Sequence, residues 1–318
     1  MERTKCIVCG SSKLATIIDL GLHPFADTFL KKEDLTKGEI VFPLVCDLCR
    51  SCGEVQLRYS TDPDERYTNH EYSYTSSNSA FSRNHWEEFA THVAEKTGLK
   101  KGFVVEAGSN DGYLCEQFAK QGNKVLGVDP SPAMAELAKE RDVSTKVALF
   151  TTAVAKKILS EQGKADLIAA NNVYNHSDEV ADFTQAVADL LAPDGTFVFE
   201  LPYWKITIES GKFDQIYHEH VSYFTVTMAE NLLKQVGLMI WNAEVVPYHG
   251  GSLRVYAKKF DATYTCAEAE KLKKEEDTLG LFEPAMYSTM MKKIHAQRAT
   301  FLKEVYTIRK AGGTIVAV

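Results

Sequence analysis

The middle of the chain alternates short apolar runs with longer segments in which apolar residues recur every three or four positions. Short apolar runs bounded by turn residues predict buried strands, whereas the three-to-four spacing predicts helices packed on a sheet. Five runs joined by short loops predict an α/β domain whose parallel sheet is covered on both faces. The runs cover residues 104–106, 124–128, 144–147, 165–172 and 196–201.

Further elements are expected on both sides of this alternation. Apolar residues at helical spacing from Ser79 to Gly98 predict a helix that leads into the first strand. After the fifth strand the pattern predicts a helix at 227–236, a hairpin of strands at 238–246 and 252–258, and a helical region at 266–310. The run at 312–318 has the pattern of the first strand of another α/β unit, so we expect the start of a truncated C-terminal α/β domain. The expected domains are 1–75, 76–260 and 261–318.

The turn after the first strand carries the first candidate chemistry. The strand delivers Glu106, and the turn from Gly108 to Gly112 holds Asn110 and Asp111. A dinucleotide site favours a third glycine, which lets a pyrophosphate approach the helix N-terminus. An acidic turn with two glycines suits a cationic nucleoside that carries an amino acid. The sequence therefore predicts that these five residues border S-adenosylmethionine.

Polar residues also follow the later strands, where parallel strands place ligand-binding groups. Asp129 ends the second strand, where an acid holds a ribose diol, although it is also suited to cap the next helix. Phe150 is able to lie against a purine. Asn171 and Asn172 end the fourth strand, and His176 follows them over the expected crevice.

The segment Tyr217-His218-Glu219-His220 places four proton-handling side chains in a row between apolar flanks. Such groups are costly to bury without a purpose. In a strand, His218 and His220 have the spacing of metal ligands. In a helical turn, Tyr217 and His220 share a face instead. A solvated polar loop is the third interpretation.

The first 60 residues resemble a separate small module. Cys6 and Cys9 form one CxxC-Gly knuckle, and Cys49 and Cys52 form another, with a strand-like stretch at 40–45 between them. Two such knuckles provide the four thiolates of a tetrahedral site, which suits zinc, although unliganded surface cysteines are the alternative. With no position left for water, the predicted zinc is structural.

Composition narrows the function classes. The net charge is −7, from 36 basic and 43 acidic residues, and no basic stripe occurs, so nucleic-acid binding is not expected. No apolar run is long enough to span a bilayer, so no membrane partner is expected. The N-terminus has no signal-like apolar segment. We expect a cytoplasmic protein, where seven cysteines are more often metal ligands or free thiols than disulfides.

Together these motifs resemble one family, the zinc-containing, S-adenosylmethionine-dependent C-methyltransferases of deoxysugar nucleotides. The resemblance runs from Cys6 to Val318 and includes the segment His249-Gly-Gly-Ser-Leu-Arg254. It implies a Rossmann-like class I methyltransferase domain, and C-methylation of a TDP-4-keto-deoxysugar at C3 or C5. His220 corresponds to the base that forms the enolate, with Glu219 and Tyr217 orienting the base and the sugar.

The resemblance also implies roles for other residues. His176 is at a sugar-facing position, and either Tyr72 or Tyr74 closes the site. Glu106, Asp129, Phe150 and Asn171 would hold the cofactor. The expected partner is a small nucleotide sugar, bound by a monomer or a weak homo-oligomer. O- or N-methylation of a small metabolite and a non-catalytic zinc-ribbon binding module are the alternative functions.

Overall fold

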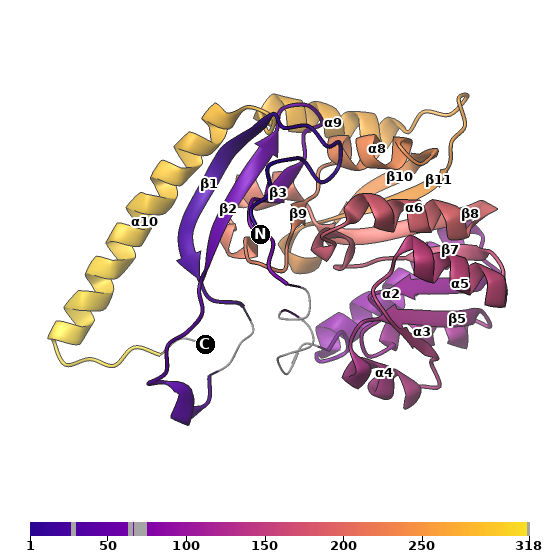
Figure 1. The fold of residues 1–318 in the computed structure, drawn as a ribbon, viewed down its shortest axis with the longest axis horizontal. Coiled ribbons are helices and arrows are strands. Elements are labelled where there is room, and N and C mark those ends of the chain that lie inside the picture. Colours follow the sequence, from indigo (N-terminus) through magenta and orange to yellow (C-terminus); the bar gives the residue numbers. More distant parts are fainter. Residues whose placement is uncertain (27–29, 63–65, 67–74, 317–318) are drawn as a thin grey trace.

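The computed structural model describes residues 1–26, 30–62, 66 and 75–316. Within them the strands form a seven-stranded sheet and a four-stranded sheet (Figure 1). The expected alternation of strands and helices is confirmed in the larger sheet. Its elements in chain order are α2 (Ala80–Thr97), β4 (Phe103–Ala107), α3 (Tyr113–Lys120), β5 (Lys124–Asp129), α4 (Pro132–Lys139), β6 (Thr145–Val147), α5 (Thr152–Gln162), β7 (Ala165–Ala169), η2 (Tyr174–His176), α6 (Val180–Leu190), β8 (Leu191–Pro202), α7 (Trp204–Ser210), η3 (Phe213–Gln215), α8 (Val226–Lys234), β10 (Leu238–Val246), η4 (Tyr248–Gly250) and β11 (Ser252–Lys259).

The seven strands follow the order β10-β11-β8-β7-β4-β5-β6. The strands from β6 to β8 are parallel, whereas β11 pairs antiparallel with β8 and β10 pairs antiparallel with β11. The predicted hairpin of the last two strands is therefore confirmed, and it extends the parallel sheet at one edge. The carboxyl ends of β4, β5, β7 and β8 meet at one edge, where ligands bind in doubly wound sheets.

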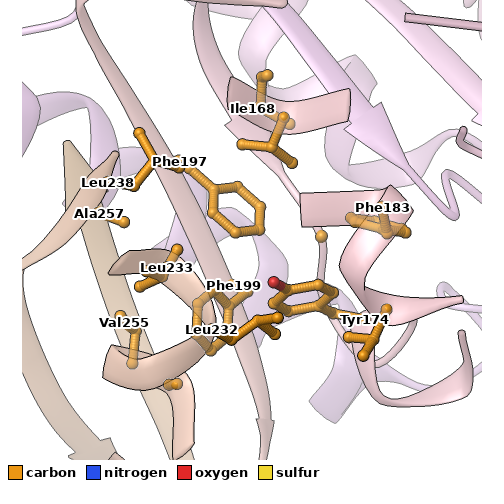
Figure 2. Close-up of a cluster of buried hydrophobic side chains, with 14 of the residues drawn as sticks. Ile168, Tyr174, Phe183, Phe197, Phe199, Leu232, Leu233, Leu238, Val255 and Ala257 are labelled. Atoms are coloured by element: carbon orange, nitrogen blue, oxygen red, sulfur yellow. The ribbon is translucent and has the colours of Figure 1, made fainter. Parts of the chain in front are cut away.

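Apolar side chains cover both faces of this sheet. On one face, α5, α6 and α8 pack on alternate residues of the strands. Figure 2 shows Tyr174, Phe197 and Phe199 in this layer, with Tyr174 and Phe199 at a ring-centroid distance of 5.2 Å. On the other face, Trp86 and Phe89 of α2 pack with α3 on Val104 and Val198. The core therefore fixes the strand ends that carry the candidate site.

The N-terminal module forms the smaller sheet, with the order β1-β2-β3-β9. Its strands are β1 (Leu14–His23), β2 (Phe42–Cys49), β3 (Val55–Leu57) and β9 (Ser222–Tyr223), and η1 (Lys32–Asp34) precedes β2. The last strand comes from much later in the chain than the other three, and in it Tyr223 pairs with Val55 and Ser222 with Gln56. The chain returns to the N-terminal module immediately after His220.

The C-terminal region is helical up to residue 310. The predicted helical region consists of α9 (Ala267–Leu279) and α10 (Pro284–Lys310), separated after Gly280, which ends α9 in the left-handed conformation. Tyr287, Met290 and Ile294 of α10 pack on the smaller sheet, and the rest of α10 extends beside β1 (Figure 1). Residues 312–316 form no strand and pair with none of the strands in the described part of the chain. The prediction of a strand there is therefore wrong over this range. No helix among the described residues combines the length and apolarity needed to cross a membrane.

Candidate metal centre and active site

The two CxxC knuckles bring their four sulfur atoms together. The Sγ atoms of Cys6, Cys9, Cys49 and Cys52 all lie within 4.8 Å of one another. The Cys6–Cys52 and Cys9–Cys49 sulfur distances are both 3.6 Å. A tetrahedral zinc site with Zn–S bonds of about 2.3 Å has sulfur atoms about 3.8 Å apart. The donor set therefore fits zinc, and these four residues would hold it.

Neighbouring groups fix the knuckles in place. The side-chain oxygen of Gln56 accepts a hydrogen bond from the Ile7 amide at 2.9 Å, and its nitrogen donates to the Lys5 carbonyl at 3.1 Å. Asn231 of α8 donates to the Cys52 carbonyl at 3.0 Å. The metal centre is therefore connected directly to α8, a helix that packs on the larger sheet, and this position is consistent with a structural role.

The candidate cofactor cavity lies at the carboxyl ends of β4, β5 and β7. Of the residues predicted to hold the cofactor, seven line this cavity, namely Glu106, Gly108, Asn110, Asp129, Phe150, Asn171 and Asn172. Gly108 has φ 70°, and a Cβ there would lie 2.6 Å from the side chain of Val173. A larger residue at this position would therefore clash with Val173 and distort the turn.

Asp129 organises the turn as well as lining the cavity. Its carboxylate accepts hydrogen bonds from the Asn110 amide at 2.8 Å and from the Ser131 amide at 2.9 Å. The residue that caps α4 is Ser131, whose hydroxyl accepts from the Met134 amide. The capping alternative for Asp129 is therefore wrong, because the helix begins two residues later.

Asp111 and Gly112 do not line the cavity. The Asp111 carboxylate accepts a hydrogen bond from the Ser76 hydroxyl at 2.5 Å and another from Ser77. It therefore fastens the segment before α2 to the turn. Gly112 has φ 75°, and a Cβ there would lie 2.8 Å from Cβ of Ala138, so this glycine permits close packing of α3 on α4.

Several cavity groups are buried without an internal partner. Oε2 of Glu106 and both side-chain polar atoms of Asn171 make no hydrogen bond within the described residues. Burial raises the pKa of Glu106 to about 8. Buried polar atoms without partners are costly, so they favour a ligand that hydrogen-bonds to them. S-adenosylmethionine, with a charged amino group and a ribose, fits these groups together with Asp129.

The segment from Tyr217 to His220 forms a turn rather than a strand. The His220 amide donates to the Tyr217 carbonyl at 3.0 Å, which places both side chains on one face. His218 lies elsewhere, edge-on to Phe25 and Phe42 at ring-centroid distances of 5.6 and 5.9 Å. Within the described residues, the four cysteines form the metal-binding cluster, and the two histidines do not join one. The metal-ligand interpretation is therefore wrong, because these histidines point to different surroundings.

The tautomer of His220 follows from its partners. Nδ1 lies 2.8 Å from the Gln215 carbonyl oxygen, which only accepts, so Nδ1 carries the proton. Nε2 is then the basic nitrogen, and the Tyr217 hydroxyl donates to it at 2.8 Å. Burial lowers the pKa of His220 to about 4, so its ring is neutral at pH 7.

His176 connects this turn to the cofactor cavity. It lines the cavity, and its ring centroid lies 5.1 Å from that of His220. Burial also lowers the pKa of His176 well below its usual value, and the nearby positive charge of Arg66 acts in the same direction. Glu219 is buried in the same turn. Tyr72 and Tyr74 lie outside the described residues.

The sequence analysis missed several residues near the site. Arg66 lines the cavity and forms an ion pair with Asp178, which also pairs with Arg3. Trp86 lines it too, and its indole nitrogen is buried without a partner among the described residues. Arg66 lies in an aperiodic polar segment, and Trp86 has the spacing of a core residue, so no sequence pattern distinguished them.

Family models cover nearly the whole chain. A zinc binding domain matches residues 6–67, a methyltransferase domain matches 80–243, and a C-methyltransferase C-terminal domain matches 247–318. The methyltransferase model alone spans about half of the chain, and its bounds agree with the elements that build the cofactor cavity.

Individual proteins are similar to all or part of the chain. The chain is 32% identical over 314 residues to the C-methyltransferase NovU of Streptomyces niveus, across 98% of this chain and 74% of that protein. A ubiquinone biosynthesis O-methyltransferase of Chelativorans sp. is 30% identical over 114 residues, which is 34% of this chain and 45% of that enzyme. Among solved structures, the PH0226 protein of Pyrococcus horikoshii is 19% identical with a TM-score of 0.48, and covers 59% of this chain and 95% of its own. The chain therefore belongs to the C-methyltransferase family, as an S-adenosylmethionine-dependent C-methyltransferase whose N-terminal module provides a four-cysteine structural zinc site.

Proposed function

We propose that this enzyme methylates a carbon next to the ketone of a keto-deoxysugar nucleotide, and that His220 is the base that forms the enolate. The observation that carries the proposal is the pair of contacts made by His220. Nδ1–H is held by the Gln215 carbonyl, and Nε2 is left as a neutral base beside the Tyr217 hydroxyl. A ketone acidifies the neighbouring C–H bond, so an oriented neutral imidazole is matched to its removal.

In the proposed reaction, the C–H bond breaks and its proton moves to Nε2 of His220. The Tyr217 hydroxyl, which donates to Nε2 in this structure, turns to the developing enolate oxygen and stabilises its charge. When bound, S-adenosylmethionine supplies the methyl group that the enolate carbon accepts. Because His176 borders both the cofactor cavity and His220, it supports a sugar position between them.

The remaining side chains bind and orient. Glu106, Asp129 and Asn171 would hold the amino acid and ribose parts of the cofactor, with Phe150 beside the adenine. Glu219 would position the turn that carries the base, and Tyr72 or Tyr74 would close the site over the sugar. The role of all these residues is alignment, which supplies much of the rate enhancement when two substrates must meet.

The test is methyl transfer from ¹³C-methyl-labelled S-adenosylmethionine to a TDP-4-keto-6-deoxyhexose. We expect a product whose labelled methyl carbon is bonded to a sugar carbon, identified by its chemical shift and carbon–carbon coupling. The matched control is the same TDP-sugar with a hydroxyl in place of the ketone, which should not react. A label bonded to oxygen or nitrogen, or equal reaction of the control, would contradict the proposal.

A further inference from the structure

Three groups from the N-terminal part of the chain converge on one carboxylate of the cofactor cavity. Asp178 lines this cavity and lies two residues after His176. Its Oδ1 atom accepts a hydrogen bond from the Ser60 hydroxyl at 2.8 Å and forms an ion pair with Arg3. Its Oδ2 atom forms an ion pair with Arg66. The segment that follows His176 is therefore fastened to the N-terminal part of the chain.

The guanidinium of Arg66 also contacts the turn that carries the candidate base. Its Nη1 donates to the His218 carbonyl at 3.5 Å, and its Nη2 donates to the Thr61 carbonyl, also at 3.5 Å. His218 lies two residues before His220 in that turn. One guanidinium therefore bridges the segment after His176 and the segment before His220.

The chemistry of arginine suits such a bridge. A guanidinium has five N–H donors in one rigid plane, so a single side chain donates in several directions at once. The Arg66 side chain is only 1% exposed. A buried charge is costly unless it is paired, so the ion pair with Asp178 fixes the guanidinium in one place. The His218 carbonyl is therefore held at a fixed position relative to Asp178.

The ring contacts of His220 do not by themselves set its position in the cavity. Both partners, Gln215 and Tyr217, lie within five residues of His220, so they orient the imidazole within its own segment. Arg66 connects that segment with the cavity lining that includes His176, whose ring centroid lies 5.1 Å from that of His220. A displacement of about 1 Å costs about 10²-fold in rate when reacting groups must be aligned.

We propose that Arg66 is a positioning residue of the reaction, which sets the place of the base relative to His176 by bridging Asp178 and the His218 carbonyl. Arg66 follows β3 and precedes α2, and it lines the cavity. The N-terminal part of the chain therefore contributes a side chain to the active site as well as the metal centre. The inference rests on the proposed function, in which His220 is the base.

The test removes the guanidinium and then supplies it in solution. Arg66→Ala is assayed for methyl transfer to a TDP-4-keto-6-deoxyhexose, and for exchange of the sugar C–H in D₂O with S-adenosylhomocysteine bound. We expect kcat and the exchange rate to fall together, at least tenfold, because both need the base in place. The KM for the sugar and the affinity for S-adenosylhomocysteine should stay within threefold. Guanidinium chloride at about 20 mM, far below denaturing concentrations, should raise kcat of the variant at least fivefold and leave wild type unchanged.

The matched control is Arg3→Ala. Arg3 pairs with the same carboxylate, but its guanidinium also donates to the Leu57 carbonyl of β3 at 3.3 Å, so its loss should leave kcat within threefold of wild type. Arg66→Lys replaces the alanine variant if that variant does not fold. The ammonium keeps a charge beside Asp178, but its three donors share one atom, so we expect kcat to fall at least fivefold. S-adenosylhomocysteine affinity reports the folding of each variant.

Several results would overturn the inference. A kcat within threefold of wild type would show that the guanidinium is not needed, and a change confined to KM or to S-adenosylhomocysteine affinity would assign Arg66 to ligand binding. A loss in folded Arg66→Ala that guanidinium does not restore, or an equal loss in Arg3→Ala, would assign the effect to stability. If wild type itself shows neither C–H exchange nor a C-methyl product, the proposed function fails and this inference fails with it.

Discussion

The hydroxyl of Tyr217 donates a hydrogen bond of 2.8 Å to Nε2 of His220, three residues further along the same turn. Because Nδ1 of His220 is committed to a backbone carbonyl, this hydroxyl lies at the one nitrogen able to accept a substrate proton. The pair therefore places a base and a hydrogen-bond donor side by side. An enolisation needs both groups, one for the proton and one for the oxygen.

Replacement of Tyr217 by phenylalanine separates these two roles. The variant keeps the ring that packs against His220, at a centroid distance of 4.1 Å, and loses only the hydroxyl. We expect kcat for methyl transfer to fall by about 10²-fold, the usual cost of removing one donor to a developing oxyanion. The affinity for S-adenosylhomocysteine, measured by calorimetry, should stay within twofold. A kcat within threefold of wild type would exclude the hydroxyl from the reaction.

The pH dependence of the reaction should reflect the burial of His220. Its pKa is lowered to about 4, so the neutral, basic form persists well below the range in which a free histidine becomes protonated. We expect kcat/KM for the sugar to be level from pH 7 down to about 5 and to fall only near pH 4. An acid limb centred between pH 6 and 7 would mean that a solvent-exposed histidine is the base.

Cofactor binding should release a proton through Glu106. Burial raises the pKa of this carboxyl to about 8, so the carboxyl is mostly protonated at pH 7 in the empty site. The cationic amino group of the cofactor favours the carboxylate and should displace that proton. Calorimetry in buffers of different ionisation enthalpy measures the release. Glu106→Gln should bind without it, and equal release by both proteins would assign the proton to another group.

Removal of zinc should damage catalysis more than cofactor binding. The four cysteines hold the module whose sheet ends in β9, and β9 begins two residues after His220. We expect chelation, or the variant Cys49→Ser, to reduce methyl transfer at least tenfold and to lower the thermal stability of the protein. S-adenosylhomocysteine affinity should change by less than about threefold, because the cofactor cavity is built on the larger sheet. The fully buried Cys46 offers a matched control, since Cys46→Ala removes a thiol that is not a metal ligand.

The parts of the fold that the sequence predicted are those with local signals. Short apolar runs and turn residues located the parallel strands, and the spacing of the cysteine pairs located the metal centre. The pairing of β3 with β9 had no such signal, because two residues contact a strand more than 160 positions earlier. Strand β1 was likewise missed, since its burial does not alternate regularly.

In the candidate site too, the residues with a local sequence signal were predicted and those without one were missed. Glu106, Asp129 and Asn171 line the cavity as expected, because each lies at or just beyond the carboxyl end of a parallel strand. Asp111 also lies in a turn just after a strand, yet its carboxylate accepts hydrogen bonds from the hydroxyls of Ser76 and Ser77. Arg66 reaches the cavity through a tertiary ion pair with Asp178 that no spacing rule predicts. Local pattern therefore identified the strand ends, whereas side-chain partners depended on the folded structure.

The central claim is that His220 removes a proton from a carbon next to a ketone, and the most direct measurement is hydrogen exchange of the sugar. A TDP-4-keto-6-deoxyhexose is incubated in D₂O with enzyme and S-adenosylhomocysteine, and loss of the C–H signal is followed by NMR. We predict that wild type exchanges the hydrogen at the carbon that it methylates. His220→Asn should bind S-adenosylhomocysteine normally, and should exchange and methylate at least 10²-fold more slowly. Exchange by His220→Asn at the wild-type rate, or methylation by wild type of a carbon that does not exchange, would contradict the account.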